Sequence, residues 1–585
     1  MSVKQEFDEA ATSYKKAFKQ LQVISREFIW GRTITFALLL ILLIGTDVLL
    51  FASIGGILLA SVFLFLSNRD QVNERKKNLQ RNLWELNEEE QQRLDGTLES
   101  VHTGDEYLDV GHPFAQDLDI FGKNSLFASV NRSYLRSSRR KLAELLTSPV
   151  DLRQVEARQV AIQELKDNRE WRQSLQATLR SLSSEKVNEE ALPENLKSLP
   201  GSRLASWLAV FLGLSTLIVL ILISTSMVPS LAAWIMVFIN LLVLLYFNLR
   251  LQNQALKTDH LQKFLVAFLQ ALRIISEGEF KSPSLIKLQS YIGTRAIKEI
   301  GILRQVVFLL DSRTNILWPL INVVLLIDLH TFSLLQKWIQ RNEGQFQRWL
   351  QCVNEFEALC SMATFADVNV DFTIPVLTED KMMWTGTRVG HPLIPSSERV
   401  TNDFDLHQPI NLVTGSNMSG KSTFLRTIGL NSVMAWVGLP VCAHHLKCSK
   451  FTIYTSMRTQ DDLSSGTSSF YAELKRIRGL FDLEEASKDT VLFLLDEILK
   501  GTNSQDRHSG AQGIITRLLG KDAVGFISTH DLALADEYEA HEHVKNYSFN
   551  SQLVKDRLEF DYQLRPGKCQ NTNASILMKQ LNIID

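Results

Sequence analysis

The sequence predicts a multidomain fold: an α-helical core and lever region with transmembrane helices, joined to a C-terminal α/β P-loop domain. A glycine-rich loop between a short apolar strand and a helix, near residue 415, indicates nucleotide-binding α/β architecture. Long runs with helical periodicity, over about 126–199 and 252–348, predict the helical core. Two stretches almost free of charge, 33–67 and 204–249, predict helices that cross a membrane.

The first 104 residues divide into three segments. Residues 1–32 carry apolar side chains at three- and four-residue steps among Lys and Glu, which predicts an amphipathic helix. Residues 33–67 are apolar and divide at Gly45-Thr46-Asp47, so we expect a short membrane hairpin or one tilted span. Residues 68–104 predict a charged helix and a linker.

Basic residues flank both apolar stretches. Lys and Arg precede and follow 33–67, and the same holds for 204–249, which divides near Pro229. Because basic residues mark cytoplasmic flanks, an even number of crossings is favoured, about four in all. We therefore expect a cytoplasmic or inner-membrane, multi-pass protein whose soluble domains face the cytoplasm. The alternative is a pair of buried hairpins inside a soluble core.

The helical core is predicted in two parts, 105–200 and 252–375, and the C-terminal domain occupies 376–585. The net charge of −2 gives no global attraction to nucleic acid, so any DNA contact must be local. The densest basic cluster of the core consists of Arg136, Arg139, Arg140 and Lys141. At this spacing some of these side chains share one helix face, which is either a solvated surface or a set of DNA phosphate contacts.

The glycine-rich loop fits G-x-x-x-x-G-K-[ST] over Gly415–Ser422 and follows the apolar residues Leu412 and Val413. Backbone N–H groups of such a loop, with the positive end of the following helix, cradle nucleotide phosphates. Lys421 is expected to reach the β- and γ-phosphates, and the Ser422 hydroxyl to bind Mg²⁺. The predicted ATP-binding set comprises Gly415, Ser416, Asn417, Met418, Ser419, Gly420, Lys421, Ser422 and Thr423.

Two further strands are expected to end beside this loop. The apolar run 490–495 ends in Asp496-Glu497, and the run 524–527 ends in Ser528-Thr529-His530. Since the carboxyl ends of parallel strands share one edge, Asp496 is placed to hold Mg²⁺ and Glu497 to activate water. His530 is a candidate sensor of the γ-phosphate, with an ordinary turn residue as its alternative.

A turn rich in small residues, 461–468, opens a further helix. One interpretation is a capped helix start, with Ser469 and Glu473 near capping-box spacing. The other is a second phosphate-binding helix N-terminus, which lies too far along the chain to serve its own P-loop and is offered to a partner's nucleotide.

These blocks together resemble the ATPase domain of the MutS family, within the ABC class of ATPases. The similarity rests on GSNMSGKST at 415–423, DDLSSGTSSF at 461–470, LLDEILKGTNSQD at 494–506 and STHD at 528–531. It extends to SLFASVNRSYLRSSRRKLAEL at 125–145. The resemblance implies a homodimer with two composite sites, each using one subunit's P-loop and the trans signature residues Gly466 and Ser468 of the other.

Two departures from the family pattern stand out. The family's mismatch-reading N-terminal domain has no counterpart, since residues 1–104 carry other segments. Where the family commonly packs an aromatic side chain on adenine, this chain has Arg399-Val400. Either Arg399 stacks on the base or Val400 alone lines the pocket.

The function expected from these features is that of a membrane-anchored, MutS-like ATPase using ATP and Mg²⁺ and coupled to the binding of mismatched or structured DNA. Two alternatives stay open at this stage. One is the ATPase of an ABC-type membrane transporter, which shares the P-loop and also has spans. The other is a nucleotide-gated membrane scaffold without DNA-repair activity.

Overall fold

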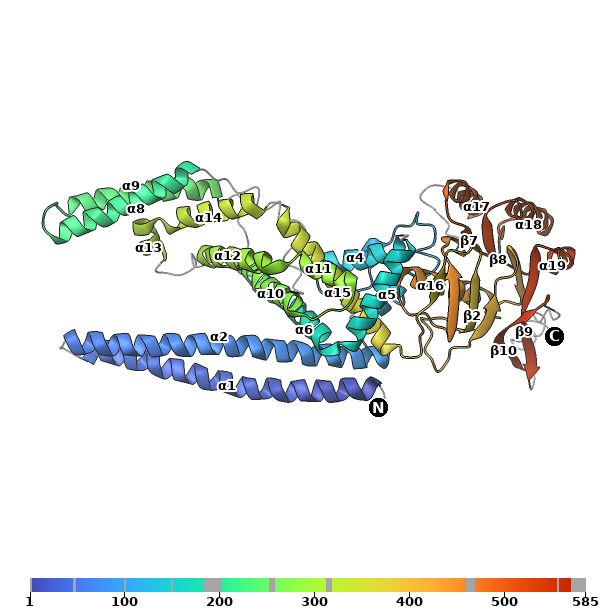
Figure 1. Ribbon diagram of the computed structural model, residues 1–585, viewed down its shortest axis with the longest axis horizontal. Coiled ribbons are helices and arrows are strands. Elements are labelled where there is room, and N and C mark those ends of the chain that lie inside the picture. The colour runs from blue at the N-terminus through green and yellow to red at the C-terminus, as the bar shows by residue number, and fades with distance from the viewer. Residues whose placement is uncertain are drawn as a thin grey trace. The chain divides into compact units, whose positions relative to one another are not determined.

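A computed structural model describes residues 3–45, 49–98, 101–148, 151–182, 203–251, 258–311, 318–342, 344–458, 469–554 and 557–569. The chain divides into two compact units (Figure 1). Unit 1 comprises residues 1–100, 133–138 and 168–357, and unit 2 comprises residues 101–132, 139–167 and 358–585.

Unit 1 is helical. It contains α1 (Val3–Gly45), α2 (Leu49–Leu94), α6 (Arg169–Arg180), α8 (Arg203–Ser224), α9 (Leu231–Leu251), α10 (Thr258–Glu277), α11 (Pro283–Ser290), α12 (Gly293–Asp311), α13 (Trp318–Leu325), α14 (Ile327–Asn342) and the first part of α15 (Gln345–Val368). Helices α1 and α2 pack along one another as a long hairpin, coloured blue in Figure 1.

Polar contacts join α1 to α2 in the middle of the hairpin. The Arg32 guanidinium lies 3.0 Å from the Asp70 carboxylate, and the Ser25 hydroxyl donates to Glu74 at 2.6 Å. The Asn73 side chain donates to the carbonyl of Leu21 at 3.1 Å. These bonds fix the relative register of the two helices.

The expectation of membrane spans is wrong. In the part of the chain that the structure describes, no helix combines the length and the apolar character needed to cross a bilayer. The described residues of 33–67 belong instead to α1 and α2, whose other halves are charged. Most of 204–249 belongs to α8 and α9, which pack against α13 and α14. The predicted four spans and multi-pass location are corrected accordingly, and the transporter alternative loses its support.

A buried polar contact shows how α8 and α9 are held in this helical cluster. Asn240 on α9 is fully buried and donates to the Thr216 hydroxyl at 2.9 Å and to the Val323 carbonyl at 2.8 Å. Apolar composition over 204–249 thus reflects in part the packing of helices on one another. Trp207 on α8 and Trp234 on α9 are exposed.

Unit 2 is a mixed α/β unit. Its helical part contains η1 (Asp105–Tyr107), α3 (Leu126–Val130), most of α4 (Arg136–Thr147), α5 (Leu152–Asp167) and the end of α15. Its first sheet has the order β1-β5-β2-β3, formed by β1 (Val376–Thr378), β5 (His445–Ser449), β2 (Trp384–Val389) and β3 (Asn402–Asp405). The predicted domain boundaries stay predictions, and the two compact units cut the chain at other points.

The second sheet of unit 2 has six strands in the order β10-β9-β4-β8-β7-β6. They are β10 (Arg557–Pro566), β9 (Val544–Val554), β4 (Ile410–Gly415), β8 (Ala523–Thr529), β7 (Val491–Asp496) and β6 (Thr452–Ser456). All neighbours are parallel except β9 and β10. The helices connecting them are α16 (Lys421–Val437), α17 (Ser469–Ala486), α18 (Ser504–Leu518) and α19 (Leu532–Glu537).

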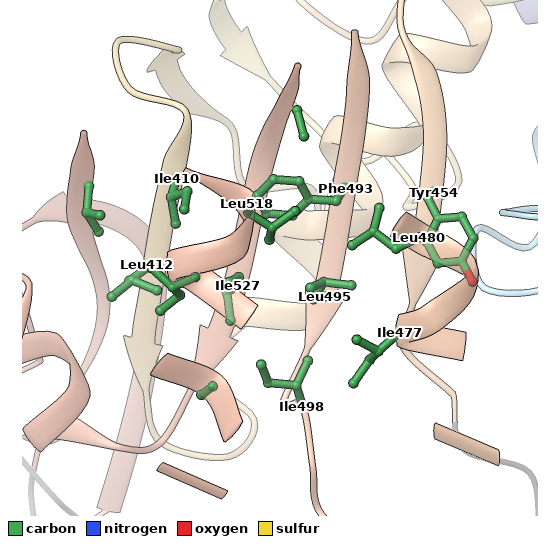
Figure 2. Close-up of a cluster of buried hydrophobic side chains, with 14 of the residues drawn as sticks. Ile410, Leu412, Tyr454, Ile477, Leu480, Phe493, Leu495, Ile498, Leu518 and Ile527 are labelled. Carbon is green, nitrogen blue, oxygen red and sulfur yellow. The ribbon is translucent and has the colours of Figure 1, made fainter. Parts of the chain in front are cut away.

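Apolar strands explain why this sheet forms the core of unit 2. Strands β4 and β7 are buried at every position, as expected for parallel strands covered on both faces. Figure 2 shows Leu412, Leu495 and Ile527 from three neighbouring strands, packed with Ile477 of α17 and Leu518 of α18. This packing brings the carboxyl ends of β4, β8 and β7 to one edge, with Thr414 opposite Thr529 and Asp496 opposite Ser528.

Candidate functional site

The glycine-rich loop runs from the end of β4 to the start of α16. A Cβ atom on Gly415 would lie 2.7 Å from the Ser419 hydroxyl and 2.8 Å from the Phe549 carbonyl, so only glycine fits there. Gly420 caps α16 with φ of 106°, a left-handed conformation that favours glycine. The loop thereby wraps closely around the amino end of α16, as a phosphate-binding loop requires.

Lys421 lies inside this loop. Its side chain is buried, and its Nζ donates to the carbonyls of Gly415 at 3.0 Å and Ser416 at 3.1 Å. The same atom lies 3.7 Å from Glu497 and 3.4 Å from the Nε2 of His530. Burial lowers the pKa of Lys421, and the nearby Glu497 opposes that change. The loop therefore positions one ammonium group at the meeting point of three strand ends.

A hydroxyl and a carboxylate meet next to Lys421. The Ser422 hydroxyl donates to Asp496 at 2.6 Å, and the Ser528 hydroxyl donates to the other Asp496 oxygen. Asp496 is buried, so these donors compensate its removal from water. A hydroxyl oxygen and a carboxylate are the oxygen ligands that Mg²⁺ prefers in phosphate sites. The donor set therefore fits a magnesium ion held by Ser422 and Asp496.

Glu497 and His530 form a close pair at the same edge. The Nε2 of His530 lies 2.7 Å from Glu497, and Lys500 lies 3.2 Å from the second Glu497 oxygen. The hydrogen bond from His530, partly offset by burial, lowers the pKa of Glu497 to about 2. The backbone of Glu497 is left-handed, with φ of 50°, and its N–H donates to the Ser528 carbonyl at 3.1 Å.

A cavity of about 850 Å³ opens beside these groups. Its walls include the predicted residues Asn417, Met418, Ser419, Gly420, Lys421, Ser422, Thr423, Val400, Asp496 and Glu497. The Ser416 and Ser419 hydroxyls are buried without a hydrogen-bond partner among the described residues. Unpaired buried donors in a phosphate-type loop match a ligand that brings several acceptor oxygens.

Val400 and Arg399 differ in their surroundings. Val400 lines the cavity, whereas Arg399 does not. The Arg399 guanidinium donates to the Ile394 carbonyl at 2.8 and 3.0 Å and lies 3.2 Å from Asp371. It also lies over the Phe372 ring. These contacts occupy Arg399 away from the cavity, so stacking of this residue on a base finds no support.

The cavity is also lined by residues that the sequence did not single out as site residues, among them His391, Glu398 and Tyr562. His391 stands in the segment Gly390-His391-Pro392. Burial lowers the pKa of His391 to about 4. Tyr562 lies on β10 with φ of 54°, and its ring lies 3.1 Å from where a Cβ on Gly420 would be. No sequence pattern places this edge strand beside the loop.

Other predicted residues lie elsewhere. Gly466 and Ser468 fall outside the described residues. The basic cluster lies on α4, where Arg136 and Arg140 are exposed and Arg139 and Lys141 are half-buried. Of the described residues that line the cavity, none comes from this cluster.

Comparison with known proteins finds similarity between the C-terminal region and MutS proteins. Residues 411–581 match the family described as MutS domain V. The chain is 30% identical over 251 residues to a DNA mismatch repair protein MutS of Natronomonas pharaonis, an alignment that covers 42% of this chain and 28% of that protein. It is 34% identical over 217 residues to the protein of the same description from Thermotoga neapolitana, covering 35% of this chain and 26% of the relative.

The chain thus spans little more than a quarter of the length of these relatives. The matched region 411–581 contains the glycine-rich loop, the Asp496-Glu497 strand end and His530. Sequence similarity and geometry agree on the same part of the chain, and the comparisons therefore support the MutS family for this C-terminal region.

Proposed function

We propose that unit 2 is a MutS-like, ABC-class ATPase that binds ATP with Mg²⁺ and hydrolyses it. The observation that carries the proposal is the meeting of Lys421, Asp496 and His530, from distant parts of the sequence, at one edge of a parallel sheet. Ligands of open α/β sheets bind at this edge. The unpaired Ser416 and Ser419 hydroxyls and the adjoining cavity support a phosphate ligand of nucleotide size.

Each group has a distinct role in this proposal. The loop N–H groups and Lys421 bind the β- and γ-phosphates, and Ser422 and Asp496 hold Mg²⁺. The ion, when bound, neutralises charge that develops on the phosphate oxygens. Glu497 orients and deprotonates the attacking water. Val400 forms part of the pocket for the base.

The His530 contact sets a condition on this chemistry. A carboxylate with a pKa of about 2 is a weak proton acceptor at neutral pH, and the hydrogen bond from His530 is the largest cause of that low value. For Glu497 to act as a base, His530 must exchange this contact for another acceptor. The γ-phosphate of bound ATP offers such an acceptor at the same edge of the sheet, which agrees with a sensor role for His530.

The further parts of the proposal concern partners. By analogy with the MutS relatives, two copies pair through their ATPase domains, with Gly466 and Ser468 of one serving the nucleotide of the other. DNA is the proposed ligand coupled to ATP turnover, since the matched relatives are described as DNA mismatch repair proteins. The exposed Arg136 and Arg140 on α4 are the candidate phosphate contacts.

The test of catalysis is the Glu497→Gln variant, which keeps the size of the side chain and removes the base. We expect kcat for ATP hydrolysis to fall by about 10²- to 10⁴-fold while ATP binding is retained. The measurement is phosphate release alongside equilibrium binding of ATP. Hydrolysis at the parental rate in the variant would refute the role of Glu497.

The test of DNA coupling uses homoduplex, mismatched and branched DNA in a salt series. A phosphate footprint gives an affinity that falls with salt, and Arg136→Ala with Arg140→Ala is expected to reduce that slope by about 1 to 2. An affinity that does not depend on salt, or a slope that the double variant leaves unchanged, would exclude this cluster as the contact.

A further inference from the structure

The first turns of α17 carry a buried carboxylate that has no role in the proposed binding or hydrolysis of ATP. Glu473 is buried, and one of its oxygens accepts the backbone N–H of Leu499. Its Oε2 has no hydrogen-bond partner among the described residues. Burial raises the pKa of Glu473, and the hydrogen bond from the Leu499 amide opposes that rise. Burying a carboxyl group costs free energy unless hydrogen bonds compensate it, which makes the contact of Glu473 with this loop notable.

The loop that Glu473 contacts is the one that follows the proposed catalytic base. It has an unusual backbone, because both Glu497 and Leu499 adopt left-handed φ values, of 50° and 62°. Residues other than glycine rarely adopt this backbone conformation, and it persists only where surrounding contacts impose it. The loop therefore needs external bonds to keep Glu497 where it is.

Described contacts account for both ends of this strained segment. At Glu497 the backbone N–H donates to the Ser528 carbonyl at 3.1 Å, which ties the residue to β8. At Leu499 the tie is Glu473. Close packing reinforces it two residues later, where a Cβ atom on Gly501 would lie 2.9 Å from the Cβ of Phe470 on α17. Helix α17 thus holds the far end of the loop by one hydrogen bond and one close contact.

We propose that Glu473 is a positioning residue for Glu497: by accepting the Leu499 N–H it holds loop 497–501 in its left-handed conformation and so keeps the catalytic carboxylate aimed at the γ-phosphate. This inference rests on the proposed ATPase function. Glu473 does not line the cavity, and the residues that bind ATP are held by β4 and α16. Loss of the contact is therefore expected to slow hydrolysis without weakening ATP binding.

The variants distinguish the effect of losing the hydrogen-bond acceptor from the effects of losing the charge and of destabilising the helix. Glu473→Leu removes the acceptor at similar volume, and Glu473→Ala removes it without inserting new atoms. Glu473→Gln keeps an oxygen that accepts the Leu499 N–H and removes only the charge. The matched control is Glu484→Leu on the same helix, because Glu484 also accepts a backbone N–H, that of Asp522 at 3.2 Å, remote from loop 497–501.

The kinetic result expected is a split between kcat and KM. In Glu473→Leu and Glu473→Ala we expect kcat to fall by about tenfold to 100-fold, because a displacement of about 1 Å in a catalytic group has an effect of this size. KM for ATP stays within about threefold of the parental value. Glu473→Gln recovers most of kcat, and Glu484→Leu keeps it. An unchanged kcat in both acceptor-free variants, or an equal loss in Glu473→Gln or Glu484→Leu, would overturn the proposal.

A second measurement does not depend on activity. Hydrogen exchange of the Leu499 amide is expected to be faster in Glu473→Leu and Glu473→Ala than in the parental protein and Glu484→Leu. Equal exchange in all of them would overturn the positioning role. If the parental protein hydrolyses no ATP, the proposed function fails, while the exchange rates still decide whether Glu473 holds the loop.

Discussion

The Asp117→Ala substitution tests how the loop 112–119 is joined to the nucleotide-binding sheet. The Asp117 carboxylate is 2% exposed. It accepts the Thr455 hydroxyl at 2.8 Å and the backbone N–H groups of Met457 at 3.1 Å and Arg458 at 3.2 Å. Its fourth donor is the Arg476 guanidinium of α17 at 3.3 Å. One buried side chain thus ties a loop from residue 117 to β6 and to the helix that carries Glu473.

The magnitude follows from what alanine leaves behind. Two backbone N–H groups lose their acceptor, each at a cost of about 1–3 kcal/mol. Arg476 loses its buried partner, and because its side chain is 23% exposed, water recovers part of that cost. We expect the free energy of unfolding of unit 2 to fall by about 3–5 kcal/mol. Asp117→Asn keeps an acceptor oxygen and is expected to cost less, about 1–2 kcal/mol.

The assay must report unit 2 by itself, because a chain of two units has no single unfolding transition. Hydrogen exchange of the β6 and β7 amides under increasing urea gives the free energy of opening of this sheet. The control is Asp119→Asn, whose ion pair with Arg458 at 2.8 Å is one-third exposed, so its cost stays below about 1 kcal/mol. A loss below about 1 kcal/mol in Asp117→Ala, or equal losses at 117 and 119, would refute this reasoning.

Two further predictions concern packing and pH. A Cβ atom on Gly525 in β8 would lie 1.9 Å from the Phe493 carbonyl, so Gly525→Ala is expected to destabilise unit 2 by about 3 kcal/mol or more. Gly513→Ala on α18, with open space around it, is expected to stabilise unit 2 by about 0.5–1 kcal/mol. Free energies of opening of the β6 and β7 amides that equal those of the parental protein would contradict both expectations. Since burial lowers the pKa of His391 from 6.5 to about 4, its neutral form stabilises the fold at neutral pH, and that stability is lost as pH falls from about 6.5 to 4. This contribution is at most about 3 kcal/mol. The free energy of opening of the β6 and β7 amides, measured at about pH 6.5 and about pH 4, is expected to fall less with acid in His391→Gln than in the parental protein.

Much of the candidate site could be predicted because its residues follow local patterns. A glycine loop between strand and helix, and acids at the end of a buried strand, keep their meaning without tertiary information. Gly415 is confined by atoms of Ser419 and Phe549, yet the glycine itself signals such a constraint. These patterns also identify the side of the sheet on which Lys421, Asp496 and His530 meet.

What could not be predicted depends on contacts between distant segments. The direction of the Arg399 side chain is set by Ile394 and Asp371, and both stacking and non-stacking were compatible with its position in the chain. The hydrogen bond from Thr455 of β6 to Asp117 joins residues more than 300 positions apart. Apolar composition over 204–249 was misread as a membrane signal because composition alone does not distinguish a lipid-facing helix from one packed on α13 and α14.

The central claim is that three strand ends surround a single bound triphosphate. Calorimetric titration of a non-hydrolysable ATP analogue with Mg²⁺, into the parental protein and Lys421→Ala, tests this most directly. A buried charged hydrogen bond to phosphate contributes about 1.5–3 kcal/mol, so we expect a loss of affinity of about tenfold to 100-fold in the variant. Equal affinity in the two proteins, or no binding to the parental protein, would contradict it.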